Sequence, residues 1–188
     1  VSQSWNADWF AAARRFFLSG GAKHFNPRWD EVDRILDYVT ALEATLVPEK
    51  DFNTRRITKR GAAMISGGDA SQACIIAKFI KQLYEIRSRI THGSRLGDEN
   101  REWLIQNFAQ VEYQVRQILV AAVQTLPPDQ AQRQTALSAL FDPTDADRGD
   151  IALQKFKEIT ATDVRAVIAE KIAKSVKGQS AANQGGQP

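Results

Sequence analysis

The sequence predicts an all-α protein. Nearly every apolar stretch has helical spacing, with hydrophobic residues recurring at intervals of three and four positions. No stretch shows convincing alternation of apolar and polar residues, and the one strand-like run, CIIAKFI, is flanked on both sides by helical pattern. Glycine pairs and prolines separate the apolar segments at spacings typical of helices. These observations together predict a helical bundle.

The first two predicted helices occupy residues 4 to 19 and about 27 to 47. The first has Ser4 as its expected N-cap and is expected to stop at Gly20-Gly21, because paired glycines commonly end helices. The second shows the clearest amphipathic pattern in the chain and is expected to stop before Pro48. Its apolar face carries Val32, Ile35, Leu36, Val39, Leu42 and Leu46.

Three further helices are predicted over residues 52 to 66, about 70 to 92 and 100 to 126. Each is bounded by residues that start or stop helices. The bounds are Gly67-Gly68 after the third, Asp69 or Ser71 before the fourth, Thr91 or His92 at its end, and Pro127-Pro128 after the fifth.

The chain divides into one main domain and a shorter C-terminal part. Residues 1 to 126 contain all the long apolar-periodic segments, so we expect them to form the bundle. Beyond Asp129 the segments become shorter, which predicts a helical appendage over residues 129 to 175. Residues 178 to 188 contain no large apolar residue, and we expect this tail to be disordered.

Composition indicates a soluble protein. Of the 188 residues, 43% are hydrophobic and 25% are charged, which is ordinary for a globular domain. No window approaches the roughly 18 apolar residues of a membrane span, and the N-terminus does not resemble a secretory signal. We therefore expect a cytoplasmic protein without membrane contact. The net charge of +3 permits a nucleic-acid partner but does not require one.

The sequence offers no set of residues for a metal or cofactor. Cys74 is the only cysteine, which excludes an intrachain disulfide and a multi-cysteine metal cage, and we expect it to be a small core residue. The two histidines, His24 and His92, have no third imidazole or close carboxylate cluster beside them. Nucleotide-binding glycine motifs are also missing. We therefore expect the protein to use no metal and no cofactor.

Three charged residues lie in otherwise apolar helix faces. Arg87 falls about 40° from Leu83, inside the apolar stripe of its helix, and Glu43 falls about 40° from Val39. Arg60 lies on the apolar side of the third helix. An unpaired charge is unfavourable inside a protein by several kcal/mol, so we expect Glu43 to pair with Arg60 or Arg87. The alternative is that these arginines extend from the stripe edge to solvent.

The end of the fourth helix carries a second polar row. Tyr84, Ser88 and His92 follow one another at intervals of four positions and share a flank. Arg87 and His92 are about 140° apart around the helix axis, so they do not converge as simple neighbours. Either the helix ends between them or the converging groups come from two chains. A C-cap role before Gly93 would also account for His92 without any chemistry.

The string YEIRSRITHG, residues 84 to 93, resembles the Arg-x4-6-His motif of the HEPN superfamily, and in particular its Apea-like branch. Two upstream segments, ALEATLVP and ITKRGAAMIS, resemble the Leu-Glu pair and the Arg-x-Ala segment of that branch. The similarity covers roughly residues 30 to 125. Three segments in the same order on successive helices make it more specific than the Arg-x4-His spacing by itself.

The resemblance implies an up-and-down bundle of four to five helices that dimerises with the motif helices facing each other. Many members of the family are metal-independent endoribonucleases of phage-defence, toxin-antitoxin or RNA-processing systems. By position, Arg87, Ser88 and His92 are the implied catalytic residues. We expect Glu43, Arg60 and Tyr84 to form a supporting polar cluster beside them. The implied partners are single-stranded or structured RNA, a second copy of the chain, and an antitoxin or partner domain.

The residue types suit metal-free RNA cleavage, in which the 2′-hydroxyl attacks the adjacent phosphorus. That reaction needs a base of near-neutral pKa and a cation to stabilise the phosphorane, roles that fit His92 and Arg87. One such histidine in each chain cannot be acid and base at once, and a twofold dimer would supply two.

Two alternatives stay open from the sequence. The first is a non-catalytic HEPN module of a larger protein that binds nucleotide, RNA or another protein. It is favoured by the modest charge, by Val1 instead of methionine at the start, and by Ser88 where asparagine, aspartate or histidine is commoner in the family. The second is a helical dimerisation domain in which the embedded charges only fix the register of the helices.

Overall fold

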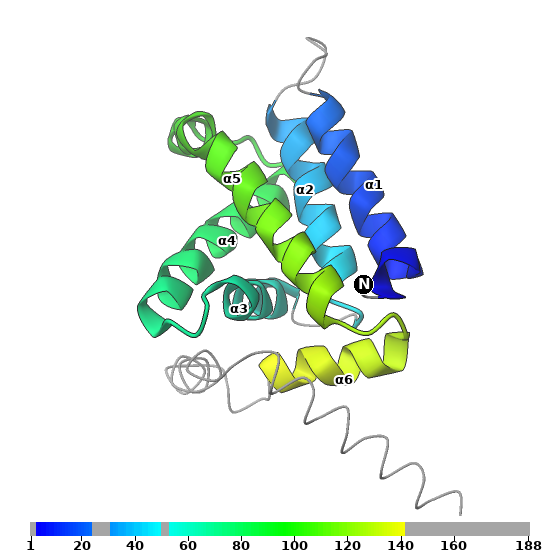
Figure 1. Cartoon of the computed structure of the whole chain (residues 1–188). Helices are drawn as coiled ribbons and strands as arrows, with labels where there is room; N and C mark the ends of the chain where they lie inside the picture. Colours follow the sequence, from blue (N-terminus) through cyan, green and yellow to red (C-terminus); the bar gives the residue numbers. More distant parts are fainter. Residues whose placement is uncertain (1–2, 24–30, 50–52, 142–188) are drawn as a thin grey trace, which may run out of the picture.

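The computed structural model describes residues 3–23, 31–49 and 53–141 (Figure 1). Within these ranges the chain forms six α-helices, one short 3-10 helix and no strand, so the predicted all-α class is confirmed. The elements are η1 (Gln3–Asn6), α1 (Asp8–Lys23), α2 (Glu31–Leu46), α3 (Asn53–Ile65), α4 (Ala70–Thr91), α5 (Asp98–Thr125) and α6 (Gln130–Leu140).

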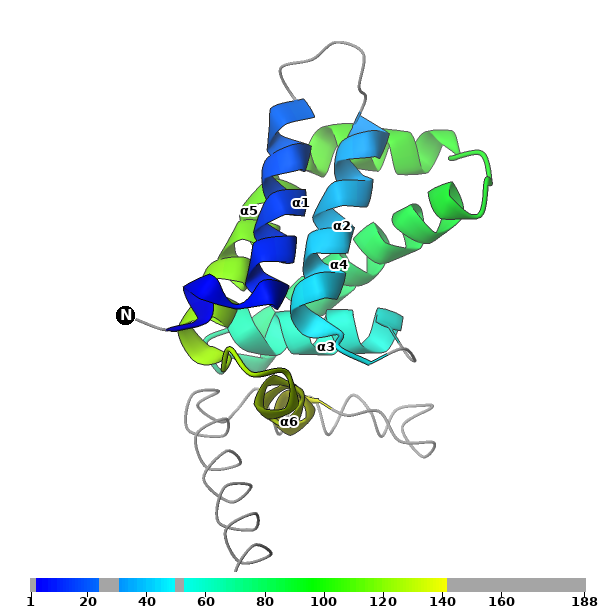
Figure 2. The ribbon, with the colours of Figure 1, turned by 90° about the vertical axis from the view of Figure 1, so that its right-hand side faces the viewer.

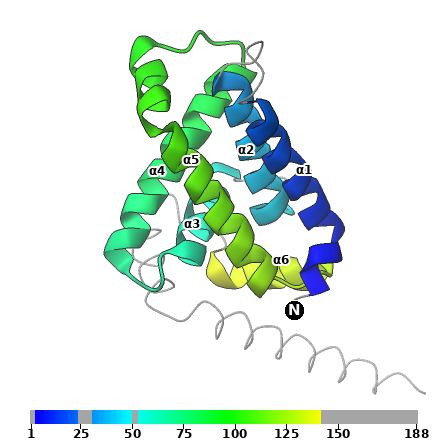
Figure 3. The ribbon, with the colours of Figure 1, turned by 45° about the horizontal axis from the view of Figure 1, so that its top comes forward.

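The helices surround one hydrophobic core. Helices α1 and α2 run antiparallel and side by side (Figures 1 and 2), and α5 crosses in front of α2 and α4 in the view of Figure 1, and in front of α4 in that of Figure 3. Helix α2 packs against both α4 and α5. Helices α3 and α6 lie across the lower end in both Figure 1 and Figure 2. All six helices contribute side chains to the same buried cluster, against which Cys74 packs half-buried. No helix in the described ranges is long and apolar enough to cross a membrane.

The beginning and end of α1 differ from the prediction. Ser4 is not the N-cap of α1: it lies in η1, and its buried hydroxyl donates to the carbonyl of Leu126. The helix also continues through Gly20 and Gly21 to Lys23, so the predicted stop at these glycines is wrong. A Cβ at Gly20 would lie 2.8 Å from Cε1 of Tyr38. Gly20 therefore serves the close approach of α1 to α2 and does not terminate the helix.

The end of α3 and the start of α4 follow their sequence signals closely, whereas the predicted start of the second helix at about residue 27 lies outside the described residues. Helix α3 ends just before Gly67 and Gly68, whose φ angles of 63° and 85° few other residues adopt readily. The side chain of Asp69 accepts hydrogen bonds from the backbone N–H groups of Ser71 and Gln72, so Asp69 is the N-cap of α4. Helix α5 begins at Asp98, two positions before the predicted start.

Helix α6 shares the core of the bundle although its residues were expected to belong to an appendage. Ala136, Leu137 and Leu140 are fully buried in the common cluster. The buried Arg133 donates from Nη1 to the carbonyl oxygens of Ala44, at 2.7 Å, and Thr45, at 3.3 Å. Residues 130–141 are thus held against the C-terminal end of α2. The rest of the predicted appendage and the tail lie outside the described residues.

Candidate functional site

Arg87 and Glu43 form the charged centre of the candidate site. Nη2 of Arg87 on α4 lies 3.0 Å from Oε2 of Glu43 on α2, and both side chains are about three-quarters buried. Of the two pairings expected for Glu43, the one with Arg87 is therefore confirmed. A hydrogen bond between two charged groups in such a partly buried position fixes the guanidinium in place.

Tyr84 completes the contacts of Glu43. Its hydroxyl donates to Oε1 of Glu43 at 3.2 Å, and the guanidinium of Arg87 lies 5.7 Å from the centre of its ring. Burial raises the pKa of Tyr84, and the negative charge of Glu43 adds to this effect, while Arg87 and Asn53 oppose it. Tyr84 therefore stays a neutral hydrogen-bond donor at physiological pH, with both oxygens of Glu43 occupied.

Arg87 retains donor capacity beyond this pair. Within the described part of the chain only its Nη2 makes a hydrogen bond, and its buried Nε has no partner. The Arg87 side chain as a whole is about one-quarter exposed. An arginine fixed through one nitrogen in this way has the orientation of its planar guanidinium set in advance of any further hydrogen bond.

Arg60 does not join this cluster. It is fully buried and donates to both carboxylate oxygens of Glu49, at 2.9 and 3.0 Å, and to the carbonyls of Leu46 and Phe141. The pKa of Glu49 lies below its ordinary value, because the hydrogen bonds and charge of Arg60 outweigh burial, which acts in the opposite direction. Arg60 thus ties the end of α2 to the segment after α6.

The other two motif residues lie at the C-terminal end of α4. Ser88 is half-buried, and its carbonyl accepts from the hydroxyl of Thr91 and from the backbone N–H of His92. His92 is the C-cap residue, and its side chain is exposed. In the described part of the chain, the side chains of Arg87 and His92 form no hydrogen bond or ring contact with each other.

Gly93 gives the end of α4 its geometry. The φ angle of Gly93 is +68°. Its N–H donates to the carbonyl oxygen of Ile90, and the N–H of Ser94 donates to the carbonyl oxygen of Arg89. This pair of hydrogen bonds is a Schellman motif, which explains the His-Gly sequence in terms of helix termination. The C-cap interpretation of His92 therefore accounts for its place in the backbone, and the exposed imidazole is left available for contact with another molecule.

The known proteins give no further guide. No family model, curated protein or solved structure matches the chain. The HEPN resemblance accordingly rests on the three segments of the sequence that carry it. Among the described residues, no group of three or more histidine, cysteine, aspartate or glutamate side chains is placed to hold a metal ion.

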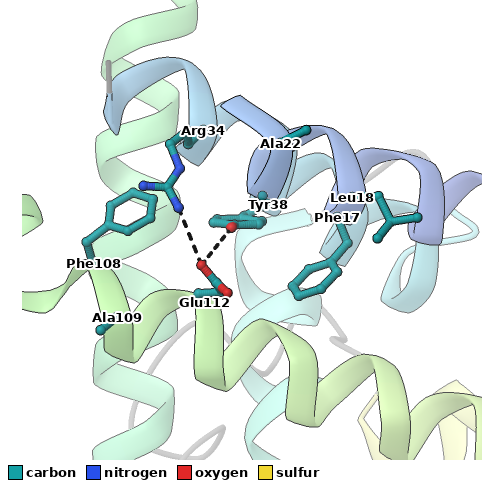
Figure 4. A pocket seen from close by; sticks show the side chains of 9 residues that line it. Phe17, Leu18, Ala22, Arg34, Tyr38, Phe108, Ala109 and Glu112 are labelled. Atoms are coloured by element: carbon teal, nitrogen blue, oxygen red, sulfur yellow. Dashed lines mark hydrogen bonds and ion pairs between the residues drawn. The ribbon is translucent and has the colours of Figure 1, made fainter. Parts of the chain in front are cut away.

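A second polar cluster, which the sequence did not indicate, lies between α1, α2 and α5 (Figure 4). Oε2 of Glu112 accepts from the hydroxyl of Tyr38 at 3.1 Å and from Nη2 of Arg34 at 3.4 Å. Arg34 is buried, and its guanidinium lies 3.8 Å from the centre of the Phe108 ring. Burial raises the pKa of Tyr38 to about 12, with the charge of Glu112 contributing in the same direction. The sequence pattern that could have pointed to this cluster is the spacing of Arg34 and Tyr38, which lie four positions apart on α2 and so share one side of the helix.

Proposed function

We propose that the protein is a metal-independent endoribonuclease of the HEPN type that acts as a homodimer, in a defence, toxin or RNA-processing system. One observation carries the proposal: Arg87, in a motif of the family spacing, is fixed on the apolar side of α4 by Glu43 and yet is partly exposed. The exposed His92 follows at the end of the same helix. A fixed cation and an accessible imidazole are the groups that cleavage through a 2′-hydroxyl needs.

A twofold dimer would supply what a single chain lacks. Arg87 and His92 point about 140° apart around α4, so one chain does not direct both groups at the same phosphate. In a symmetric dimer built around the ends of the two α4 helices, each residue meets its counterpart, and the two imidazoles can divide the roles of base and acid. In this arrangement Ser88, half-buried between the two residues, lies close to the reacting groups.

The test is RNA cleavage in the presence of EDTA. Single-stranded and hairpin RNA substrates are incubated with the full chain and with His92→Ala, Arg87→Ala and Ser88→Ala variants. Arg89→Ala is the matched control, since Arg89 is exposed on the same turn of α4. We expect cleavage by the unmodified chain and the control, and its loss in His92→Ala and Arg87→Ala with helicity unchanged. Cleavage that persists in both variants would contradict the proposal.

A second candidate function is favoured by the ion pair itself. Because Glu43 offsets the charge of Arg87, the cluster is also suited to holding α2 and α4 together in a non-catalytic binding or dimerisation module. RNA affinity without any product, unchanged in His92→Ala, would support that alternative. Loss of dimerisation in Arg87→Ala with no RNA binding by any form would identify a dimerisation module.

A further inference from the structure

Exposed apolar side chains gather on the face that α1 and α5 form together. Leu18 on α1 is 60% exposed, Trp5 in η1 is 48% exposed and Val120 on α5 is 42% exposed. Trp5 and Val120 line the same groove, and Leu18 lines the hollow next to it. Large apolar side chains in contact with water on a continuous surface are typical of a binding site.

Two hollows lie on this face and share one wall. The first is a groove of about 210 Å³ whose lining includes Trp5, Phe10 and Val120. The second is an open hollow of about 530 Å³ whose lining includes Leu18, Tyr38 and Glu112 (Figure 4). Phe17 lines both. The two hollows therefore form one surface, here named the α1–α5 strip, which consists of Trp5, Phe10, Arg14, Phe17, Leu18, Arg116 and Val120.

The spacing along α1 matches the repeat of a helix. Phe10, Arg14 and Phe17 lie within an arc of about 60° on α1, and Phe10 and Phe17 are separated by about 10 Å along its axis. A helix laid along the strip can place one apolar side chain in each hollow if those side chains are two turns apart, at positions i and i+7. An amphipathic helix with apolar side chains at this spacing is therefore the kind of partner that we expect at the strip.

The charge at the edges of the groove specifies the kind of partner. Arg14 on α1 and Arg116 on α5 both line the groove and are both exposed. Neither forms an ion pair with a carboxylate in the ranges that the structure describes. Glu112, in contrast, already accepts from Arg34 and Tyr38. The edges therefore carry two positive charges that carboxylates of a partner can complement.

The strip is distinct from the Glu43 and Arg87 cluster. On α2, Tyr38 faces the second hollow and Glu43 faces Arg87, and these two positions are about 140° apart around the helix axis. A molecule bound at the strip therefore approaches from a different side of α2 than a molecule bound at Arg87. Both sites can be occupied at the same time.

We propose that the α1–α5 strip binds an acidic amphipathic helix of a partner protein. The apolar side chains of that helix enter the two hollows, and its flanking carboxylates contact Arg14 and Arg116. Binding at the strip does not depend on RNA cleavage, because the strip shares no residue with the motif.

The experiment measures binding of two synthetic amphipathic helical peptides to the full chain by fluorescence anisotropy. The peptides share leucines at positions i, i+4 and i+7 and differ only in carrying glutamates or lysines beside them. We expect the glutamate peptide to bind at least about tenfold more tightly than the lysine peptide. The Arg14→Glu, Arg116→Glu double variant should weaken its binding about tenfold, whereas the exposed Arg101→Glu variant should not.

A second pair of variants tests the apolar contacts. Val120→Asp should abolish binding of the glutamate peptide, while Ile105→Asp, at a site on α5 that is 71% exposed, should leave it unchanged. The proposal is overturned if neither peptide binds, if both bind equally, or if Val120→Asp has no effect. It is also overturned if Val120→Asp instead abolishes self-association, or if the strip residues prove to be needed only for binding to vesicles of anionic lipid.

Discussion

Arg87 and Glu43, 44 positions apart in the sequence, form an ion pair of 3.0 Å that joins α4 to α2. The same carboxylate accepts from Tyr84, so one residue of α2 orients two residues of the motif helix. The ion pair therefore has a structural role between α2 and α4, whether or not Arg87 is catalytic. Its contribution to stability and its contribution to activity can be measured separately.

Glu43→Gln should lower the free energy of unfolding by about 1–2 kcal/mol. The pair is about three-quarters buried, so the value should lie between that of an exposed pair and that of a fully buried one. Glutamine still accepts from Tyr84, which confines the change to the charge. Urea denaturation measures the effect, and Glu85→Gln, in the exposed pair with Lys81, is the control that should change stability by less than about 0.5 kcal/mol. Equal effects of the two substitutions would show that the Glu43 pair is no stronger than a surface pair.

Gly20→Ala and Gly21→Ala should have opposite effects on stability. A Cβ at Gly20 meets three ring atoms of the fully buried Tyr38 at 2.8 to 3.2 Å, so alanine there should cost about 1–3 kcal/mol. A Cβ at Gly21 meets nothing within 4 Å, so alanine there should add about 0.5–1 kcal/mol through its helix propensity. The thermal unfolding temperatures of the two variants, compared with that of the unmodified chain, measure these changes in stability. Stabilisation by Gly20→Ala would show that α1 and α2 separate easily at this point.

The sequence predicted the helices well where a helix end depends on local chemistry. The positive φ angles of Gly67 and Gly93 and the side-chain cap of Asp69 are properties of a few adjacent residues. Gly20 could not be assigned in this way, because its role depends on Tyr38, which belongs to another helix. A glycine needed for close packing has the same appearance in a sequence as a glycine that ends a helix.

The candidate site was predictable in part for a related reason. The position of a side chain around its own helix follows from the sequence, so Arg87 and Glu43 could be singled out as charges on apolar faces. The partner of each charge is set by how the helices pack, and the sequence left Arg60 as an alternative to Arg87. Arg133 lies on the apolar side of α6, within about 40° of Leu137, so the same reasoning would have found it. Glu49 follows Pro48 and lies outside the predicted helices, so no hydrophobic periodicity indicated it as the partner of Arg60.

Gly93→Ala and His92→Ala should separate helix termination from chemistry at the end of α4. Gly93 has a φ of +68°, so alanine there should lower the free energy of unfolding by about 1 kcal/mol. His92 is exposed and caps the helix through its backbone, so His92→Ala should change stability by less than about 0.5 kcal/mol. Chemical denaturation gives both values. If His92→Ala proves as destabilising as Gly93→Ala, loss of cleavage in that variant would no longer identify a catalytic histidine.

The pair of Glu49 with Arg60 should make the fold sensitive to acid. The pKa of Glu49 in the folded chain lies below the ordinary value of 4.5, so the unfolded chain takes up a proton at higher pH than the folded chain does. The stabilisation is therefore complete above about pH 4.5 and is lost as the pH falls through the lower folded pKa. Glu49→Gln should cost about 3 kcal/mol at neutral pH, because it leaves the fully buried Arg60 without its carboxylate.

Denaturation curves between neutral and acidic pH test this expectation. The difference in unfolding free energy between the unmodified chain and Glu49→Gln should shrink as the pH falls. Glu102→Gln, at an exposed position on α5, is the control and should track the unmodified chain at every pH. A difference for Glu49→Gln that stays constant down to acidic pH would show that its effect comes from packing and not from charge.

Tyr38 should be the tyrosine that is hardest to ionise. Burial and the neighbouring charge of Glu112 raise its pKa to about 12, from an ordinary value of 10.0. The folded chain therefore keeps this proton at pH values where the unfolded chain loses it, so the associated stability is complete below about pH 10 and is lost as the pH rises towards 12. Rapid pH jumps followed by tyrosinate absorbance would record the titration before the chain unfolds. Tyr38→Phe should remove the tyrosinate titration step that occurs at the highest pH. Glu112→Gln should move that step to lower pH, because the substitution removes the negative charge that opposes ionisation of Tyr38. If the titration step at the highest pH survives in Tyr38→Phe, the high pKa belongs to another tyrosine. That result would argue against the hydrogen bond between Tyr38 and Glu112.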